Sequence, residues 1–403
     1  MASASLKTAL AAACLVLLVL LSTRSQPSTG LRRRSSLPDL AAIAGSGADL
    51  TTQSLLHEFS SHGFVGHYPK PDVDSIASAI GAAEFFGGYA LSPGPINQET
   101  AFLLSRFGAD APTRLDSGTG VTSQARIVLV DFNTARQLSP LIPSSTVAGI
   151  VDHHTLADPV GLLKPALIDI RPWGSCSSVI TSYFMSDGRS IATATAGMLL
   201  GGILSDTLNL RGPTTTDADR AAARWLAARA ALLPPAGPGP ARGDRSKALQ
   251  AATSALALEQ FQAKSNLTGV PAAKVVTSDF KTYQMESGSG AAVLAAWGTL
   301  ECVEPFYSRY RSADTMASLV EAVELLKKAK GLDLFFLSVV DVLGQRSYVV
   351  AVGPEERKLA AAMFTGAATE PAPGAPQGVV VSTTPRVSRK LEFVPPLRSA
   401  LLA

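Results

Sequence analysis

The chain has 403 residues, of which 35 are Lys or Arg and 32 are Asp or Glu, and its formal net charge is +3. The charged share of 17% and the hydrophobic share of 46% exclude a disordered protein, and the length is sufficient for two hydrophobic cores. The positive excess is concentrated at Arg24 and Arg32–Arg34, with no acid among the first 38 residues, so the nearly neutral remainder gives no electrostatic support for nucleic-acid binding. Cys14, Cys176 and Cys302 are too few and too far apart for a disulfide framework or a thiolate metal site.

Residues 1–40 are typical of a targeting segment. A charge-free apolar run from Thr8 to Ser22 follows Lys7 and is shorter than the roughly 20 residues of a membrane span. The Arg- and Ser-rich stretch after it would also suit an organelle transit peptide. We expect this signal or transit segment to direct the protein to the secretory pathway or an organelle, cleaved or kept as an anchor. If the segment is not used, the protein stays in the cytoplasm.

The region from Gly63 to about Ala230 alternates short Val- and Ile-rich runs with longer Ala- and Leu-rich segments. This alternation predicts an α/β domain with a doubly wound, mostly parallel sheet, which we place at residues 41–230. We expect strands at 63–65, 126–130 and 147–151, and helices at 75–86 and 191–204. Either Asp74 or Ser75 is expected to cap the first of these helices.

A Pro- and Gly-rich segment at 233–244 separates this domain from the rest of the chain. Proline lacks a backbone donor and glycine adds backbone entropy, so we expect a linker, placed at 231–250, and a smaller α/β domain at 251–403. In this second domain we expect a helix at 314–330 and strands at 334–340 and 347–352. A loop is expected at 367–377, before the basic segment Ser388–Lys390.

Acids and histidines follow each predicted strand of the first domain. They are His67, Asp72 and Asp74 after the first strand, Asp131 after the second, Asp152, His153 and His154 after the third, and Asp206 after the helix at 191–204. The carboxyl ends of parallel strands are where ligands bind, and so many acids in one crevice would repel each other unless cations lay among them. Carboxylate and imidazole ligands suit Mn²⁺, Co²⁺ or Mg²⁺, and two such ions could activate a water for attack on phosphorus.

Taken singly, most of these residues have ordinary structural explanations. Asp72 and Asp74 could be a helix cap and a turn residue, and Arg389 with Lys390 could be a solvated charge cluster. The adjacent pair His153–His154 is a stronger signal, because it contains two of only five histidines and follows an apolar strand and an acid.

Together these residues resemble the DHH phosphoesterase superfamily, in its branch with a C-terminal DHHA2 domain. That branch contains family II, manganese-dependent inorganic pyrophosphatases, exopolyphosphatases and Prune proteins. The resemblance runs from Gly63 to Leu397 and rests on Gly66–His67, Pro71–Ile76, Pro95–Thr100, Val151–His154, Leu204–Thr207, Pro213–Asp219, Leu332–Leu337, Ser388–Lys390 and Pro395–Pro396. It implies a DHH domain followed by a DHHA2 domain, with the active site in the cleft between them.

The resemblance also implies a role for each site residue. Two divalent ions, with Mn²⁺ preferred and Co²⁺ or Mg²⁺ possible, would be held by His67, Asp72, Asp74, Asp131, His153 and Asp206. Asp131 would bridge the ions, and His154, Arg389 and Lys390 would bind the phosphates, which makes these four the implied catalytic residues. Asp152 would orient a histidine.

Three departures distinguish the sequence from pyrophosphatases. His67 precedes Asp72 by five residues instead of four, Phe132 replaces a histidine, and no lysine pair follows Leu267. The missing pair and the segment Gly174–Ser178 are closer to exopolyphosphatases.

We therefore expect a metal-dependent hydrolase of phosphoanhydride bonds that cleaves inorganic pyrophosphate. One alternative is an exopolyphosphatase acting on short-chain polyphosphate, and another is a non-catalytic, Prune-like binding protein. The expected partners are pyrophosphate or polyphosphate and no nucleic acid. A homodimer stays an open alternative, and contact with a membrane is expected only through an uncleaved N-terminal segment.

Overall fold

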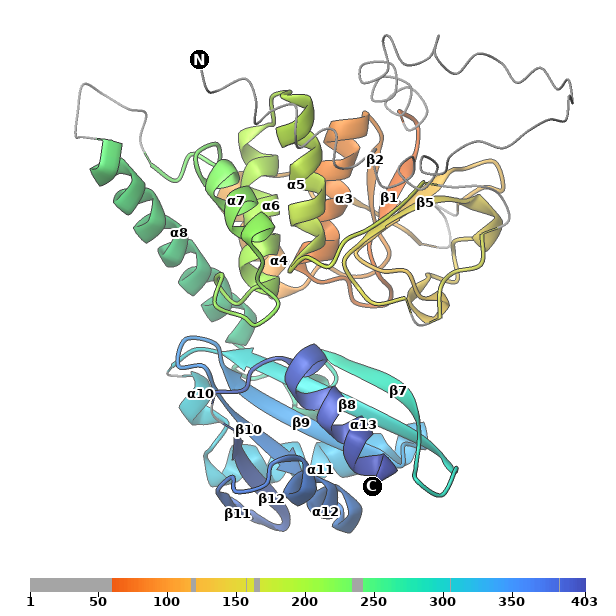
Figure 1. Ribbon diagram of the computed structural model, residues 1–403, viewed down its shortest axis with the longest axis vertical. Helices are drawn as coiled ribbons and strands as arrows, with labels where there is room; N and C mark the ends of the chain where they lie inside the picture. Colours follow the sequence, from red (N-terminus) through yellow and green to blue (C-terminus); the bar gives the residue numbers. More distant parts are fainter. Residues whose placement is uncertain are drawn as a thin grey trace, which may run out of the picture.

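The computed structural model describes residues 60–403 except 117–120, 157, 163–166, 234–241, 305 and 384, and no side chains at 242–245. The expected targeting segment and residues 234–241 of the expected linker lie outside the described residues. No helix in the described part of the chain is both long and apolar enough to cross a membrane. The described chain folds into two lobes, each built on a six-stranded sheet (Figure 1).

The first lobe contains a parallel sheet with strand order β3-β2-β1-β4-β5-β6. Its strands are β1 (Gly63–Val65), β2 (Tyr89–Ser92), β3 (Thr113–Arg114), β4 (Ile127–Val130), β5 (Val147–Asp152) and β6 (Leu167–Ile170). The order reverses between β1 and β4, and this reversal opens a crevice at the carboxyl ends of the two strands. The doubly wound α/β sheet is confirmed, as are its three Val- and Ile-rich strands.

The helices of the first lobe are α3 (Val73–Phe86), α4 (Gln98–Phe107), α5 (Cys176–Asp187), α6 (Thr193–Asp206) and α7 (Asp217–Ala227), with short 3₁₀ turns η1 (Ala135–Gln137) and η2 (Ser144–Thr146). The helix expected at 75–86 is α3, but neither Asp74 nor Ser75 caps it. Asp72 is the N-cap, because its Oδ1 accepts the Ser75 N–H at 2.9 Å. Asp74 lies inside the helix, and its carboxylate binds another helix instead.

Helix α8 (Arg242–Ser265) runs from the first lobe to the second (Figure 1). Its N-terminal turns occupy the last part of the expected linker, so the prediction that 233–244 holds no helix was wrong at its C-terminal end. The Pro residues all precede position 241, and the chain after them has no Pro until 271 to interrupt a helix. The C-terminal part of α8 packs on α4 and α6 of the first lobe and on β8 (Ala292–Cys302) of the second.

The second lobe has a sheet of strand order β11-β12-β10-β9-β8-β7 in which only β8 and β9 pair in parallel among the described strands. Besides β8, its strands are β7 (Phe280–Glu286), β9 (Leu334–Asp341), β10 (Arg346–Ala351), β11 (Thr369–Ala372) and β12 (Ala375–Thr383). Its helices are α9 (Ala272–Val275), α10 (Phe306–Arg309), α11 (Ala313–Lys330), α12 (Pro354–Met363) and α13 (Val394–Leu402), with a π turn η3 (Arg389–Phe393). Helix α11 and strands β9 and β10 confirm the predicted elements.

The loop expected at 367–377 is instead the hairpin of β11 and β12. Gly374 adopts φ 71°, a left-handed conformation that suits a tight turn, and Pro371 lies on β11 at the edge of the sheet. An edge strand tolerates a residue without an N–H, so the Pro and Gly content that predicted a loop is compatible with this hairpin.

Candidate metal centre

Asp131 lies at the centre of the site, directly after β4. Its side chain is 1% exposed, and its backbone adopts φ 67°, a left-handed conformation that aspartate tolerates better than most residues. The Ser75 hydroxyl donates to Asp131 Oδ2 at 2.6 Å. Gly66 lets the chain after β1 approach this serine, since a Cβ at Gly66 would lie 2.4 Å from Ser75 Cβ. The strand order thus brings a carboxylate from β4 against the start of α3.

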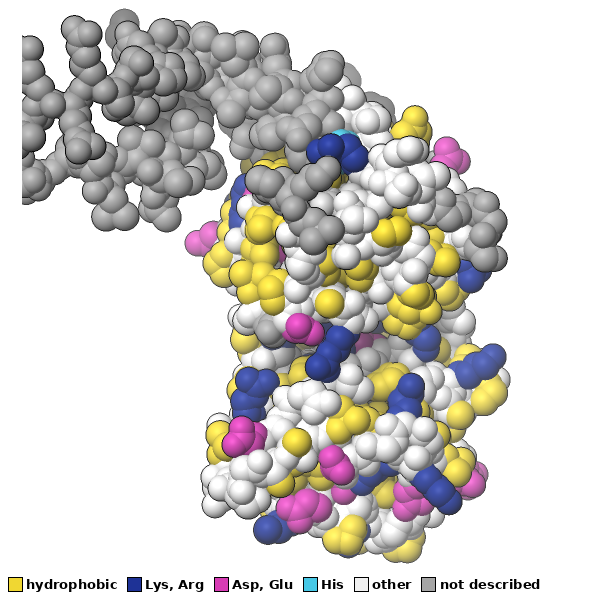
Figure 2. All heavy atoms as spheres, turned by 90° about the vertical axis from the view of Figure 1, so that its right-hand side faces the viewer, with side chains coloured by type: hydrophobic (Ala, Val, Ile, Leu, Met, Phe, Trp, Pro, Cys, Tyr) yellow, Lys and Arg dark blue, Asp and Glu magenta, His cyan; other side chains and the backbone are white. Residues whose placement is uncertain are grey.

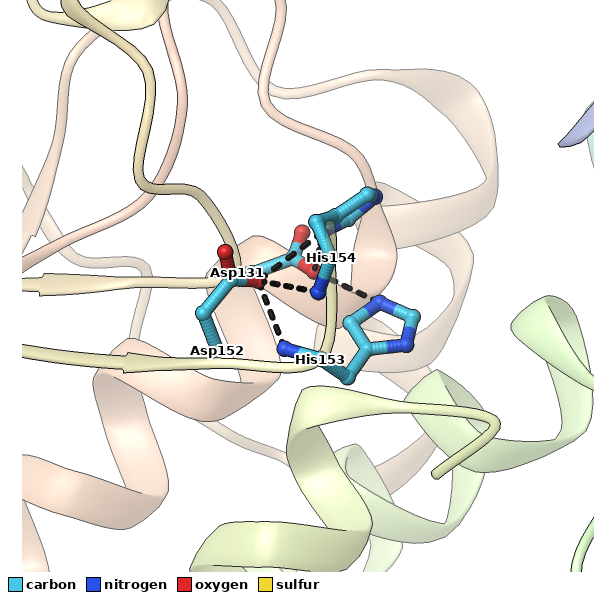
Figure 3. A group of neighbouring side chains, drawn as sticks. All are labelled: Asp131, Asp152, His153 and His154. Carbon is cyan, nitrogen blue, oxygen red and sulfur yellow. Dashed lines mark hydrogen bonds and ion pairs between the residues drawn. The ribbon is translucent and has the colours of Figure 1, made fainter. Parts of the chain in front are cut away.

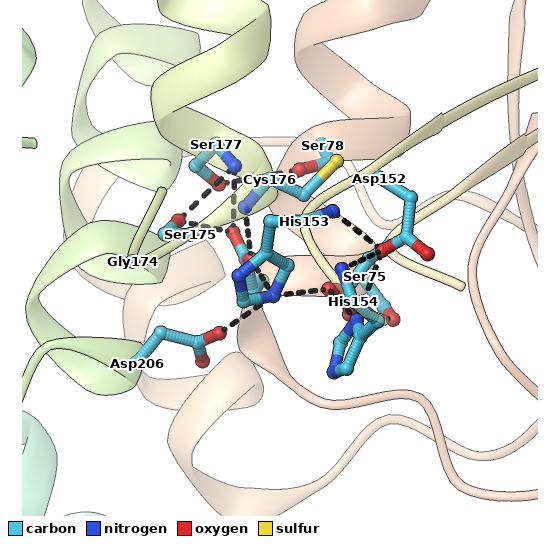
Figure 4. Close-up of polar contacts among 12 residues, drawn as sticks. Ser75, Ser78, Asp152, His153, His154, Gly174, Ser175, Cys176, Ser177 and Asp206 are labelled. Atoms are coloured by element: carbon cyan, nitrogen blue, oxygen red, sulfur yellow. Dashed lines mark hydrogen bonds and ion pairs between the residues drawn. The ribbon is translucent and has the colours of Figure 1, made fainter. Parts of the chain in front are cut away.

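Asp74 is a fully buried carboxylate held by the N-terminus of α5. The backbone N–H groups of Cys176 and Ser177 donate to it at 2.7 and 2.9 Å, and the Ser175 hydroxyl donates at 2.8 Å. Figure 4 shows Ser175, Cys176 and Ser177 beside the histidines of the site. The unpaired N–H groups and dipole of a helix N-terminus stabilise an anion, so this carboxylate is kept in place away from water.

His153 joins this carboxylate to two others. Its Nε2 lies 3.2 Å from Asp131 Oδ1, 3.4 Å from Asp206 Oδ2 and 3.8 Å from Asp74 Oδ2. Potential ligand atoms of these four residues all lie within 4.8 Å of one another.

His67, Asp72 and Asp131 form a second group of the same kind. His67 Nε2 lies 3.4 Å from Asp72 Oδ2, so the five-residue spacing still brings the histidine to the acid. Asp131 belongs to both groups, and with Asp152, His153 and His154 it forms a third.

Asp152, at the end of β5, organises the histidine pair. Its Oδ1 accepts the backbone N–H of His153 at 2.7 Å and lies 2.9 Å from His154 Nδ1 (Figure 3). Asn133 donates to its other oxygen at 2.6 Å. Against the effect of burial, His154 and His153 lower the pKa of Asp152 to about 2, whereas burial and His153 lower the pKa of His154 to about 3. The structure therefore places Asp152 beside His154 as the residue that orients its ring.

The pKa values of the acids in the site are shifted in opposite directions. Burial and the neighbouring carboxylates Asp72 and Asp74 raise the pKa of Asp131 well above its usual range, and burial and the same two acids do so for Asp206. By contrast, His67 and the Ser75 N–H hold the pKa of Asp72 below its ordinary value despite its desolvation. Carboxylates so close to one another repel, and cations are needed to compensate their negative charges.

These residues fit divalent cations. Asp131 Oδ1 and His153 Nε2 are buried without a hydrogen-bond partner among the described residues, and they face each other across 3.2 Å. Buried polar atoms are almost always satisfied, and a carboxylate oxygen and an imidazole nitrogen both coordinate Mn²⁺. The two groups that share Asp131 could hold one ion each.

One basic residue of the second lobe reaches the same place, whereas its neighbour is held within its own lobe. Lys390 Nζ donates to the His153 carbonyl at 3.3 Å, while Arg389 is held by Asp279 Oδ1 at 2.9 Å. Figure 2 shows the side of the molecule that lies on the right in Figure 1, with Lys and Arg side chains gathered where the two lobes meet.

Sequence analysis missed Lys281, on β7. Its positive charge is one of the smaller causes that lower the pKa values of Asp72, His154 and Lys390. A signal was present in the sequence Asp279–Lys281, which places two charges two residues apart at the start of β7.

The other departures have structural explanations. Phe132 is 1% exposed and packs with Leu129, Ile142 and Val160 in an apolar cluster, so it lies in the core and not in the site. Thr268 and Gly269, which follow Leu267, lie in an exposed turn and supply no cation.

Comparison with known proteins gives matches across both lobes. Residues 64–203 match the N-terminal domain of the DHH family, and residues 258–400 match the DHHA2 domain. A Deinococcus radiodurans protein described as a probable manganese-dependent inorganic pyrophosphatase is 31% identical over 340 residues, which cover 82% of this chain and 96% of that protein. The manganese-dependent inorganic pyrophosphatase of Methanocaldococcus jannaschii is 29% identical over 346 residues, with 83% and 98% covered.

A solved structure agrees with these matches. The crystal structure of a Methanococcus jannaschii protein assigned to the family II inorganic pyrophosphatases aligns with a TM-score of 0.66 and 26% identity, covering 85% of this chain and all of that one. With two domain matches in the expected order and a relative above 30% identity along almost its whole length, the chain belongs to the manganese-dependent, family II inorganic pyrophosphatases, DHH proteins with a C-terminal DHHA2 domain.

Proposed function

We propose that this protein hydrolyses inorganic pyrophosphate to two phosphates, using two divalent cations with Mn²⁺ preferred. The observation that carries this proposal is the pair of ligand groups that share the buried carboxylate of Asp131. His67 and Asp72 complete one group, and Asp74, His153 and Asp206 complete the other. When bound, the cations supply Lewis acidity, which lowers the pKa of a water and neutralises phosphoryl charge.

The side chains around these groups bind and orient the substrate. Lys281, Arg389 and Lys390 carry positive charge to the lobe interface, where a fork-shaped guanidinium and two ammonium groups suit the oxygens of two linked phosphates. His154 directs Nδ1 at Asp152, which leaves Nε2 to face the substrate. Asp279 competes with phosphate for Arg389, so binding exchanges one anion for another.

Attack by water on one phosphorus breaks the bridging P–O bond, and the second phosphate leaves. The lobe interface must close for this step, because the anion-binding residues Arg389 and Lys390 and the acid cluster belong to different lobes.

An exopolyphosphatase is the second candidate. The turn at Thr268–Gly269 carries no cation, and Phe132 is buried in the core, so this site has fewer polar groups for a short substrate than the resemblance implies for a pyrophosphatase.

The test is phosphate release by the full chain from pyrophosphate and from polyphosphate at equal concentration, with Mn²⁺, Co²⁺ or Mg²⁺. We expect faster release from pyrophosphate with Mn²⁺. Faster release from the longer chain would establish the exopolyphosphatase instead, and no release from either would indicate a Prune-like binding protein.

A variant ties the activity to the site. Asp206→Asn replaces one carboxylate with a neutral amide of similar size. We therefore expect metal-dependent turnover to fall by at least about tenfold while the fold is kept. Asp217→Asn changes an exposed acid on α7 and is the matched control. Equal turnover in the two variants would reject the proposed ligand set.

A further inference from the structure

The peptide bond between Trp173 and Gly174 lies between two polar side chains of the first lobe. Its carbonyl oxygen is 3.1 Å from His153 Nδ1, and its N–H donates to Asp219 Oδ2 at 2.9 Å. The C=O and N–H of one peptide unit are held in a plane, so neither can turn without the other. This single peptide therefore connects a carboxylate to the imidazole in the acid cluster, and Figure 4 shows Gly174 close to that ring.

The contact with Asp219 is closely packed. The Asp219 side chain is 0% exposed, and a Cβ at Gly174 would lie 2.8 Å from its Oδ2 and 2.7 Å from Thr207 Cγ2. Only glycine permits this approach of the backbone to the carboxylate. The same Oδ2 accepts the backbone N–H of Thr216 at 2.7 Å and its hydroxyl at 2.6 Å. The Asp219 N–H donates back to the Thr216 hydroxyl oxygen at 3.4 Å, which completes a capping box at the start of α7.

The Trp173 carbonyl determines which face of His153 is offered to a cation. With Nδ1–H donated to this oxygen, the lone pair is on Nε2, the atom that lies 3.2 to 3.8 Å from three carboxylates. A negative charge at the N–H end of a peptide polarises the unit and makes its carbonyl a stronger acceptor. Partners of this kind fix the orientation of a ligating histidine and raise its basicity.

We propose that Asp219 is a positioning residue for metal binding, which acts on His153 through the Trp173–Gly174 peptide. This inference rests on the proposed function, in which His153 is a metal ligand. A purely structural role for Asp219 would be the capping of α7, which it shares with Thr216. The two roles can therefore be separated by changing one residue at a time.

The test compares Asp219→Asn with Thr216→Ala in the full chain. Asparagine keeps the size and one acceptor oxygen but removes the charge, whereas the Thr216 change weakens the cap and leaves the Gly174–Asp219 contact. The measurement is the dissociation constant of Mn²⁺ from electron paramagnetic resonance of the free ion. We expect Asp219→Asn to weaken binding by about 10- to 100-fold and Thr216→Ala to leave it close to that of the unaltered chain.

A second measurement reports on the histidine itself. In ¹⁵N spectra of the Mg²⁺-loaded protein, the His153 ring should show a protonated Nδ1, and Asp219→Asn should shift this signal while Thr216→Ala should not. Equal Mn²⁺ binding by Asp219→Asn and the unaltered chain, or equal weakening by the two variants, would overturn the role of Asp219. Failure of the unaltered chain to bind Mn²⁺ would instead contradict the proposed function.

Gly174→Ala supplies an independent variant if Asp219→Asn does not fold. It leaves the Asp219 charge in place but forces the carboxylate away from the peptide. We expect weaker Mn²⁺ binding here as well, and unchanged affinity would again overturn the proposal.

Discussion

At the scale of single residues, Asp74 shows how a buried carboxylate is held at a fixed position. Three donors from the start of α5 surround it, and α6 approaches it so closely that only a glycine fits at position 202. A Cβ at Gly202 would lie 2.4 Å from Ser177 Oγ and 2.9 Å from Asp74 Oδ1. Glycine here has a packing role, because the helix geometry alone does not require it.

We predict that Gly202→Ala lowers the free energy of unfolding by about 1–3 kcal/mol, the usual cost of overpacking a core. Because the added methyl group displaces Asp74, Mn²⁺ affinity should fall as well. Urea unfolding of the metal-free protein and Mn²⁺ titration measure the two effects.

Gly161→Ala is the control, since a Cβ there would meet nothing within 4 Å. If the two alanine variants bound Mn²⁺ equally, Asp74 would not be held by this packing.

At the scale of elements, α3 begins at a residue with two tasks. Asp72 Oδ1 caps the helix through the Ser75 N–H, while Oδ2 faces His67 in the second ligand group. Asparagine caps helices about as well as aspartate, but its neutral amide is a poor ligand for Mn²⁺. The structural and chemical contributions of this residue can therefore be separated.

We predict that Asp72→Asn leaves the free energy of unfolding of the metal-free protein within about 0.5 kcal/mol of the unaltered value. Metal-dependent turnover should still fall by at least about tenfold. Asp72→Ala should lose the same turnover and also the helix cap, so its free energy of unfolding should be about 1 kcal/mol lower than that of Asp72→Asn.

Urea unfolding and phosphate release are measured on the same samples. Equal destabilisation by the asparagine and alanine variants would mean that capping is not the structural task of Asp72.

The elements that the sequence predicted are those with strong local patterns. Strands β4 and β5 are Val- and Ile-rich runs, of which β4 is followed by Asp131 and β5 ends at Asp152, and α11 has a regular apolar face. Strand β8 was missed because it is Ala-rich and contains Gly298. Small residues are poor strand formers, but a Cβ at Gly298 would lie 3.0 Å from Leu337 and 3.1 Å from Phe335, so β8 needs them for packing.

The site residues on strand ends were predictable because the doubly wound order brings those ends together. Lys281 and Asp219 were not assigned roles, since these depend on contacts across lobes and through a peptide that no local pattern encodes. The cap at Asp72 was misplaced because three closely spaced residues, 72, 74 and 75, could all cap a helix.

At the scale of the whole molecule, hydrogen bonds join the two lobes. Lys390 reaches the His153 carbonyl, Lys70 donates to the Thr277 carbonyl at 2.6 Å, and Gln345 donates to the Arg211 carbonyl at 3.1 Å. A further connection is built around Lys264, near the end of α8. Its Nζ lies 2.6 Å from Glu301 on β8 and 3.4 Å from Glu99 on α4.

The contacts of Lys264 connect the junction of the two lobes with the metal centre. Lys264 Nζ also lies 3.4 Å from the Ser205 hydroxyl, and Ser205 precedes Asp206. Burial raises the pKa of Glu99. Desolvation alone would lower the pKa of Lys264, but Glu301 and Glu99 raise it, so the lysine stays charged. One cation thus neutralises an acid from each lobe at the point where α8 connects them.

We predict that Lys264→Met lowers the free energy of unfolding by about 1–3 kcal/mol, because two acids lose their buried partner. The lobes should no longer hold one angle, so Arg389 and Lys390 should bind phosphates less well and KM for pyrophosphate should rise more than kcat falls. The Mn²⁺ affinity should change little, since all six proposed ligands stay in place. Steady-state kinetics, Mn²⁺ titration and small-angle scattering with and without a phosphate ligand provide the measurements.

Lys358→Met removes an exposed lysine on α12 that is 3.8 Å from Glu355, and serves as the control because surface pairs contribute little. Adding Glu301→Gln to Lys264→Met removes one of the stranded acids and should recover part of the stability without restoring KM, since the neutral pair no longer ties α8 to β8. A loss of Mn²⁺ affinity as large as the rise in KM would instead place the effect of Lys264 at Asp206, through Ser205, and not at the angle between the lobes.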